Sequence, residues 1–202
     1  MNEGSRIRVF MLDDHEIVRE GLAQMIDREP DMEVVGSIGT AAGAVSAVAV
    51  AAPDVAVLDV RLADGSGIDV CRDIRSEHPE IVCLMLTSFS DDRAIIEASV
   101  AGAAGFVLKQ VRGNDLMHAI RKVAGGATLL DPATVRLAHQ RLRQAEGGVL
   151  EQLTEQERKI FDLIGEGLTN RQIGERVFLA EKTVKNYVSS ILMKLGMDRR
   201  TE

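Results

Sequence analysis

The sequence predicts an α/β domain built on a doubly wound, five-stranded parallel sheet, followed by a small all-α domain. Across residues 1–125, short apolar runs alternate with segments of helical periodicity, which is typical of a parallel sheet with helices on both faces. From Leu153 onward the apolar spacing is helical throughout. A chain of 202 residues, 46% of them hydrophobic, is long enough to bury two such cores.

Five apolar runs are expected to form the sheet. Helical segments separate them, as the spacing of Leu22 and Met25 and that of Ile120 and Val123 indicate. In such a sheet, ligands bind beyond the carboxyl ends of the strands, where the strand order changes direction. The expected strands are 7–12, 34–37, 55–58, 81–86 and 105–107.

A helical linker is expected over residues 126–150, between the α/β domain and an all-α domain of residues 151–202. Asp131 is the expected N-cap of the linker helix, and Pro132 occupies its first position. An apolar stripe then continues to Leu142. The chain therefore divides into two domains joined by a helix.

The net charge of −7 is unevenly distributed. Residues 1–125 carry 12 Lys and Arg against 20 Asp and Glu, whereas residues 171–200 carry 7 basic residues against 3 acidic ones. This local cationic surface could meet nucleic-acid phosphates, or it could be an ordinary solvated helix face. Charge alone leaves both interpretations open.

The sequence does not indicate a secreted or membrane protein. The N-terminus lacks a signal pattern, and no apolar stretch approaches the length of a membrane span. Cys71 and Cys83 lack the spacing of metal ligands and are interpreted as packing residues. We therefore expect a reduced, cytoplasmic chain.

Polar residues follow four of the five predicted strands. Asp13 and Asp14 follow the first strand, Asp59 the third, Thr87 the fourth and Lys109 the fifth. These strand ends meet at one edge of the sheet, and clustered carboxylates repel one another unless a cation such as Mg²⁺ lies among them. A carboxylate can attack phosphorus while a lysine balances the phosphoryl oxygens, so the pattern predicts phosphoryl chemistry. The alternative is that each residue simply ends a strand in a polar loop.

Four segments resemble the receiver domain of two-component response regulators, over residues 7–125. They are Asp13-Asp14-His15, Leu58-Asp59-Val60-Arg61-Leu62, Leu86-Thr87-Ser88 and Gly105-Phe106-Val107-Leu108-Lys109. The resemblance implies a flavodoxin-like fold in which Asp59 receives a phosphoryl group from a sensor histidine kinase. It also implies that Asp14, Asp59 and the backbone carbonyl of Arg61 hold Mg²⁺, with Asp13 joining through water.

Thr87 and Phe106 match the switch pair of the receiver family. The resemblance implies that the Thr87 hydroxyl turns toward the phosphoryl group and that the Phe106 ring moves inward behind it. The segments expected to change are the strand ending at Leu86, the helix 91–101 and the strand holding Phe106. The alternative is that Phe106 is an ordinary core residue.

Two positions depart from the receiver pattern. Ala63 stands where the family usually has proline, and Gln110 follows Lys109 where many receivers have a proline after a cis bond. With glutamine there, no cis peptide is expected and the loop after Lys109 is expected to be less rigid. The acidic site is expected to be unaffected.

Helix signals are strong in the C-terminal section. Thr154 with Glu157 and Thr169 with Gln172 form capping boxes, which predict two helix starts. A third helix is expected to begin at residues 180–181. The short turn before it is typical of a helix-turn-helix motif.

The last helix has one apolar and one polar face. Val184 and Val188 lie on the apolar face, and Lys182, Lys185 and Asn186 lie on the polar one. Lysines neutralise phosphates and asparagine pairs with a base edge, as a recognition helix in the major groove requires. An amphipathic surface helix is the alternative.

The C-terminal section resembles the LuxR-type DNA-binding domain. The matching segments include Leu153-Thr154-Glu155-Gln156-Glu157, Gly167-Leu168-Thr169-Asn170-Arg171-Gln172-Ile173, Lys182-Thr183-Val184-Lys185-Asn186 and Lys194-Leu195-Gly196-Met197. Together with the receiver, this makes the NarL/FixJ class of regulators. The resemblance implies that phosphorylation of Asp59 favours a homodimer, which binds double-stranded DNA through Lys182, Lys185 and Asn186 and regulates transcription.

The chain stops at Glu202, where this family continues into a further helix that commonly forms the dimer contact. Either the sequence is cut short there or the helix is absent in nature, and in both cases weaker self-association and weaker operator binding are expected. The linker helix 132–142 is a second candidate for the dimer contact.

Two other functions remain as alternatives. A phosphohydrolase of the haloacid dehalogenase type also combines Asp, Thr, Lys and Mg²⁺, but its nucleophile follows the first strand in an Asp-x-Asp pattern. Here Asp13 and Asp14 are adjacent and Asp59 follows the third strand, so only slow self-dephosphorylation is expected and not enzymatic turnover. The C-terminal section could instead be a protein-binding module that acts on RNA polymerase without touching DNA.

Overall fold

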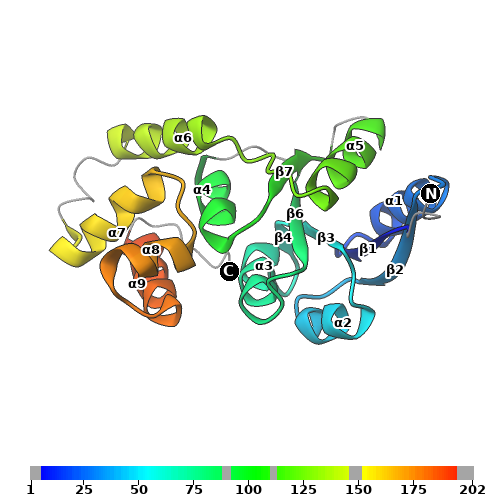
Figure 1. Cartoon of the computed structure of the whole chain (residues 1–202), viewed down its shortest axis with the longest axis horizontal. Coiled ribbons are helices and arrows are strands. Elements are labelled where there is room, and N and C mark those ends of the chain that lie inside the picture. The colour runs from blue at the N-terminus through cyan, green and yellow to red at the C-terminus, as the bar shows by residue number, and fades with distance from the viewer. Residues whose placement is uncertain (1–5, 88–91, 110–112, 146–151, 195–202) are drawn as a thin grey trace. The chain divides into compact units, whose positions relative to one another are not determined.

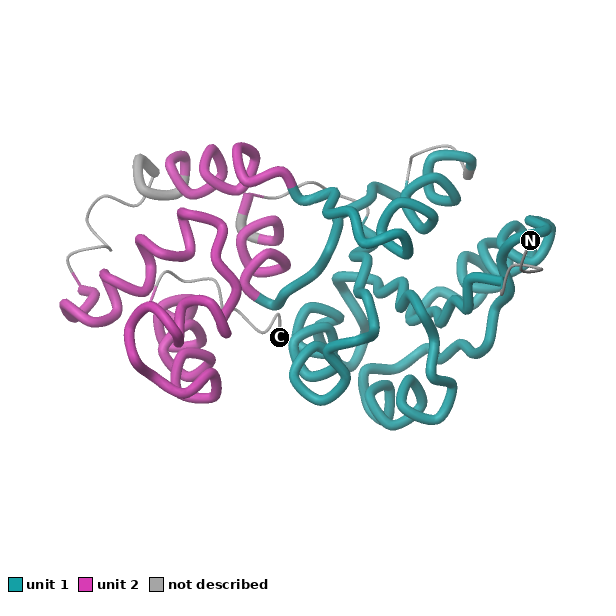
Figure 2. The backbone as a smooth tube through the Cα atoms, viewed as in Figure 1, with its two compact units in different colours: residues 1–90, 101–130 teal, residues 91–100, 131–202 magenta. Residues whose placement is uncertain are grey.

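The structure, a computed structural model, describes residues 6–87, 92–109, 113–145 and 152–194 (Figure 1). The chain forms two compact units, which are coloured separately in Figure 2. Unit 1 comprises residues 1–90 and 101–130, and unit 2 comprises residues 91–100 and 131–202. Each unit is described separately below.

Unit 1 contains a five-stranded parallel sheet. Its strands are β1 (Ile7–Leu12), β2 (Met32–Ile38), β3 (Val55–Asp59), β6 (Val82–Thr87) and β7 (Gly105–Leu108). Their order is β2-β1-β3-β6-β7, so the order changes direction at β1 and β3. The fold class predicted from the sequence is confirmed, and every expected strand is present with its ends shifted by at most two residues.

Helices cover both faces of this sheet. Apolar residues of α1 (Glu16–Asp27) and α5 (Gly113–Ala124), among them Ile26 and Ile120, pack in one cluster with Val57 and Leu84 of the central strands. The helices α2 (Ala44–Ala51) and α3 (Gly67–Glu77) pack together on the other face. Continuous apolar strands such as β3, all of whose residues are buried, require this double cover.

A small antiparallel hairpin follows β3. Its strands are β4 (Arg61–Leu62) and β5 (Gly65–Ser66), in which Arg61 pairs with Ser66 and Leu62 pairs with Gly65. Ala63 and Asp64 form its tip. The Ser66 hydroxyl then accepts a hydrogen bond from the Ile68 N–H and caps α3.

The helix α4 (Asp92–Ala101) belongs to unit 2, although it lies between β6 and β7 in the chain. Its residues Ile96 and Val100 are buried in the same apolar cluster as Ile160 and Val188. In a doubly wound domain, a helix between two parallel strands ordinarily packs on the sheet. Periodicity shows that a helix has an apolar face but not which core that face enters, so the sequence could not predict this arrangement.

The remaining helices of unit 2 are α6 (Pro132–Ala145), α7 (Glu155–Gly165), α8 (Asn170–Val177) and α9 (Glu181–Lys194). Both predicted capping boxes are present, with Thr154 capping α7 and Thr169 capping α8. The helices α8 and α9 pack against each other across a three-residue turn. A helix-turn-helix arrangement is therefore confirmed.

Two further expectations concern the whole chain. Cys71 and Cys83 are both free and buried, as expected of packing residues. None of the helices in the described ranges has the length and apolar character needed to cross a membrane.

Glu157 ties the start of α7 to the end of α9. Its carboxylate accepts hydrogen bonds from Lys194 Nζ at 2.6 Å, Ser190 Oγ at 2.8 Å and the Thr154 N–H at 2.7 Å. Burial raises the pKa of Glu157, but these donors outweigh it and lower the pKa from 4.5 to about 2. The ionised carboxylate thus stabilises unit 2.

We expect Glu157→Gln to destabilise unit 2 by about 2 kcal/mol at neutral pH, because the amide loses the ion pair with Lys194. A depressed pKa contributes stability above the unfolded-state value, and this stability is lost as pH falls from about 4.5 toward 2. The difference in the free energy of unfolding between the variant and the parent should therefore shrink over that pH range. Hydrogen exchange of the α7 and α9 amides measures this stability difference. A difference that does not change with pH would contradict this account.

Candidate functional site

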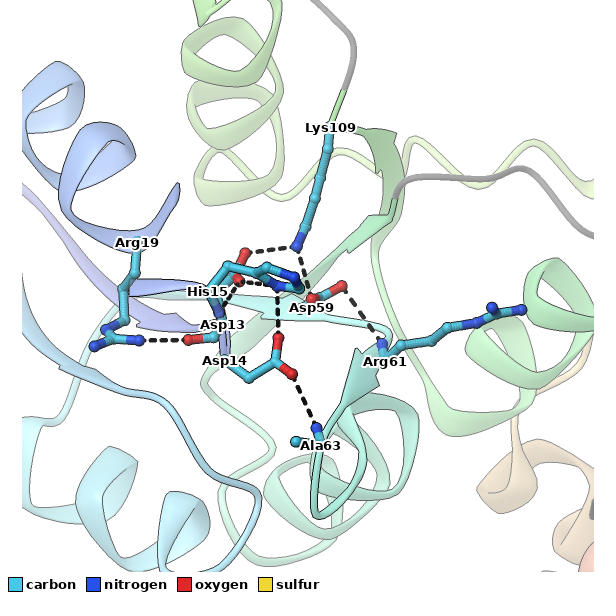
Figure 3. Close-up of polar contacts among 8 residues, drawn as sticks. All are labelled: Asp13, Asp14, His15, Arg19, Asp59, Arg61, Ala63 and Lys109. Atoms are coloured by element: carbon cyan, nitrogen blue, oxygen red, sulfur yellow. Dashed lines mark hydrogen bonds and ion pairs between the residues drawn. The ribbon is translucent and has the colours of Figure 1, made fainter. Parts of the chain in front are cut away.

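The acidic site lies where the strand order of unit 1 changes direction. Asp13 and Asp14 directly follow β1, and Asp59 is the last residue of the adjacent strand β3 (Figure 3). Ligand atoms of these three residues and of His15 all lie within 4.8 Å of one another. Asp13 is 1% exposed and Asp59 is 5% exposed, so two carboxylates are withdrawn from water. The convergence predicted from the sequence is present.

Lys109 supplies the positive charge of this site. It follows β7, and its Nζ lies 2.7 Å from Asp13 Oδ2 and 2.7 Å from Asp59 Oδ2 (Figure 3). Burial raises the pKa of Asp59, the charge of Asp13 raises it further, and Lys109 opposes both. Burial would lower the pKa of Lys109, but its two carboxylate partners outweigh burial and raise that pKa. The lysine is therefore held in its charged form between two carboxylates.

Backbone contacts hold the residues after β1 in place. Arg19 of α1 donates a hydrogen bond to the Asp13 carbonyl at 2.6 Å, and the His15 N–H donates to Asp13 Oδ1 at 2.9 Å. Asp14 Oδ2 accepts a hydrogen bond from the Ala63 N–H at 3.0 Å. Sequence reasoning missed the hydrogen bonds made by Arg19 and Ala63, because neither contact follows from a motif.

The donor set fits a hard divalent cation. Asp14 Oδ1 is buried and lies 2.8 Å from His15 Nδ1. Carboxylate oxygens gathered in this way are the ligands that Mg²⁺ prefers in proteins. Arg61, predicted to offer its carbonyl, is two residues beyond Asp59 and donates its N–H to Asp59 Oδ1 at 3.4 Å. Asp13, Asp14, His15 and Asp59 are thus grouped, and the Arg61 carbonyl as a metal ligand stays a prediction.

The predicted switch residues occupy neighbouring strands. Thr87 ends β6 and is buried, and Phe106 lies in β7 with its side chain partly buried. The strands pair in parallel, and the Lys109 N–H donates to the Thr87 carbonyl at 2.6 Å. Phe106 is therefore not a fully buried core residue, and its role as a switch stays a prediction.

The polar face of α9 is the second candidate site. Val184, Val188 and Ile191 of α9 are buried, while Lys182 and Asn186 are exposed. The side chain of Lys185 is only 17% exposed and lies 4.0 Å from Glu181. The structure thus confirms the amphipathic helix but covers Lys185 more than the sequence predicted.

Two predictions lie outside the described residues. They are the conformation of the loop beginning at Gln110 and the consequences of the chain end at Glu202.

Comparisons with known proteins match both halves of the chain to known families. Residues 9–121 match the family described as the response regulator receiver domain, and residues 151–202 match the bacterial regulatory proteins of the luxR family. The luxR match includes α7, α8 and α9. The receiver match includes the five polar residues predicted at the strand ends: Asp13, Asp14, Asp59, Thr87 and Lys109.

Several relatives match along nearly the whole chain. The DNA-binding transcriptional activator DevR/DosR of Mycobacterium tuberculosis is 50% identical, with 97% of this chain and 91% of that protein covered. The transcriptional regulatory protein LiaR of Bacillus subtilis is 36% identical, with 97% and 94% covered. The run Phe178–Val188 by itself indicates a likeness to DosR, and the match over 97% of the chain confirms it.

A solved structure supports the fold of unit 1. The receiver domain of the response regulator NarL from Mycobacterium tuberculosis superposes with a TM-score of 0.59 at 29% identity, covering 61% of this chain and 99% of that one. The fold, the acidic site and the sequence matches all point to the same family. We conclude that the chain belongs to the two-component response regulators that join a receiver domain to a LuxR-type DNA-binding domain.

Proposed function

We propose that Asp59 accepts a phosphoryl group from a sensor histidine kinase and that this modification controls sequence-specific DNA binding by unit 2. One observation carries the proposal: the buried carboxylate of Asp59 lies beside Lys109 and two further carboxylates at the point where the strand order changes direction. Ligands bind at this position in open α/β sheets.

The transfer follows from the charges at this site. The Asp59 carboxylate attacks the phosphorus of a phosphohistidine, the phosphorus–nitrogen bond breaks, and the electron pair stays on the histidine of the kinase. Lys109, 2.7 Å from Asp59, then pairs with the phosphoryl oxygens. Asp13, Asp14, Asp59 and the Arg61 carbonyl would hold Mg²⁺, which offsets negative charge on the phosphoryl oxygens.

The phosphoryl group adds negative charge at the end of β3, next to β6. Thr87 ends β6, and Phe106 lies in β7, so the proposed switch pair spans the two strands that α4 connects. Because Ile96 and Val100 of α4 are buried in the core of unit 2, a change in these strands has a direct covalent path to the DNA-binding unit.

The output is proposed to be regulated transcription. A homodimer of the phosphorylated chain would place Lys182, Lys185 and Asn186 against paired half-sites of double-stranded DNA, with RNA polymerase as the further partner. No turnover of external phosphate esters is expected, since Asp59 follows the third strand and slow self-dephosphorylation suffices to reset the switch.

The test measures binding to a pool of random-sequence duplexes at fixed salt, with and without a small phosphoryl donor plus Mg²⁺. We expect the donor to enrich particular sequences and Asp59→Ala to abolish that enrichment. If the phosphoryl group attaches but no sequence is enriched, the coupling to DNA is wrong. If Asp59→Ala is phosphorylated like the parent, the acceptor assignment is wrong.

A further inference from the structure

We propose that the tip of the β4–β5 hairpin, Ala63 and Asp64, positions the carboxylates of the acidic site for the divalent cation. This inference rests on the proposed phosphoacceptor function, because it concerns the same metal position. It adds two groups that are not part of the acidic site itself: the backbone N–H of Ala63 and the carboxylate of Asp64. Both act through other residues and touch no reacting atom.

The first group is the backbone N–H of Ala63. It donates a hydrogen bond to Asp14 Oδ2 at 3.0 Å, as Figure 3 shows. The other oxygen, Oδ1, is buried and lies 2.8 Å from Nδ1 of His15. Ligand atoms of Asp14, His15, Asp13 and Asp59 all lie within 4.8 Å of one another. One oxygen of Asp14 is therefore held by the hairpin, which leaves the other to pair with His15 or with a cation.

This contact depends on a departure already visible in the sequence. Proline, usual in the family at the position of Ala63, has no N–H to donate. The alanine thus supplies a donor that a prolyl residue could not.

The second group is the carboxylate of Asp64, which fixes the tip itself. Its Oδ1 accepts a hydrogen bond from the Ala41 N–H at 2.9 Å, and its Oδ2 accepts one from the Ala42 N–H at 3.0 Å. These two donors lower the pKa of Asp64, so the carboxylate is ionised at neutral pH. Since Ala41 and Ala42 follow β2, the tip is bonded to the segments after both β1 and β2.

The base of the hairpin joins the tip to the phosphoacceptor. The Gly67 N–H donates to the Val60 carbonyl at 3.1 Å, next to Asp59. The hairpin is thus covalently linked to Asp59 through Val60 at its base and hydrogen-bonded to Asp14 at its tip. It fixes the spacing between carboxylates of two different strands, as the outer partners of metal ligands do.

The experiment measures the dissociation constant of Mg²⁺ alone for the full, unphosphorylated chain by calorimetry. Ala63→Pro removes the N–H, and Asp64→Ala removes both acceptors. We expect each variant to weaken Mg²⁺ binding about tenfold. Ala63→Ser, which keeps the N–H, should restore the affinity of the parent, and Asp64→Asn, which keeps one acceptor, should fall between.

Two further measurements separate positioning from a general loss of stability. Asp64→Ala should remove hydrogen-exchange protection at the Ala41 and Ala42 amides in a metal chelator, while the unfolding temperature in that chelator stays near that of the parent. Glu77→Ala removes the same charge from the exposed end of α3 and is the matched control.

The outcomes are distinct for the two proposals. If Ala63→Pro and Asp64→Ala both bind Mg²⁺ as the parent does, the hairpin has no positioning role and the phosphoacceptor assignment is untouched. If the parent itself binds no Mg²⁺, the proposed acidic metal site is wrong, and this inference with it.

Discussion

Replacing Lys182, Lys185 and Asn186 together by alanine is expected to lower duplex affinity about 100-fold or more while phosphorylation of Asp59 continues at the rate of the parent. Each lost base contact typically costs about 1–3 kcal/mol, and each lost phosphate contact lowers the slope of the salt dependence by about one. Lys182 and Asn186 are exposed on α9, and the helix buries its opposite face. Titration of an enriched duplex at several salt concentrations measures both effects.

The three single alanine variants add information, because Lys185 is less exposed than Lys182 and Asn186. The Lys185 side chain is largely covered and lies 4.0 Å from Glu181, so we expect it to contact DNA only after that pairing changes. Lys159→Ala, which removes a charge from the exposed surface of α7, is the matched control and should change affinity less than about threefold. Unaltered duplex affinity in the triple variant would rule out this face and favour a protein-binding role for unit 2.

The fold could be predicted from the sequence because its signals are local. The strand β3 is an uninterrupted apolar run, and Thr154 with Glu157 is a capping box whose geometry depends on four consecutive residues. The acidic edge was also predictable, since parallel strands bring their carboxyl ends together whatever the details of packing. For these features, residue type and spacing were sufficient.

Other features depend on contacts between distant segments. The burial of Ile96 in unit 2 depends on which apolar surfaces compete for α4, and periodicity does not decide that competition. The Asp64 carboxylate accepts hydrogen bonds from the backbone N–H groups of Ala41 and Ala42, more than twenty positions away. No residue pattern reveals such contacts with backbone donors. The partial cover of Lys185 has the same origin: helical spacing gives its face but not what lies over it.

We expect Gly67→Ala to destabilise unit 1 by about 3 kcal/mol and to slow phosphorylation about 100-fold. A Cβ built on Gly67 would lie 1.8 Å from the carbonyl oxygen of Asp59 and 2.9 Å from its carbonyl carbon. Both neighbours are backbone atoms, so no flexible side chain can move aside. The start of α3 or the end of β3 must shift instead, and the end of β3 carries the phosphoacceptor.

A second glycine in the same unit provides the matched control. Gly21 lies inside α1, is exposed, and has no atom within 4 Å of the position of an added Cβ. Gly21→Ala should therefore stabilise unit 1 by about 0.5–1 kcal/mol, because alanine costs less conformational entropy than glycine in a helix. Hydrogen exchange of the β3 amides and the rate of phosphoryl incorporation from a small donor would measure both variants. Because the two substitutions add the same methyl group, opposite signs would show that the close approach of Gly67 to Asp59 causes the loss. Equal phosphorylation rates in Gly67→Ala and the parent would mean that the acceptor does not depend on this backbone contact.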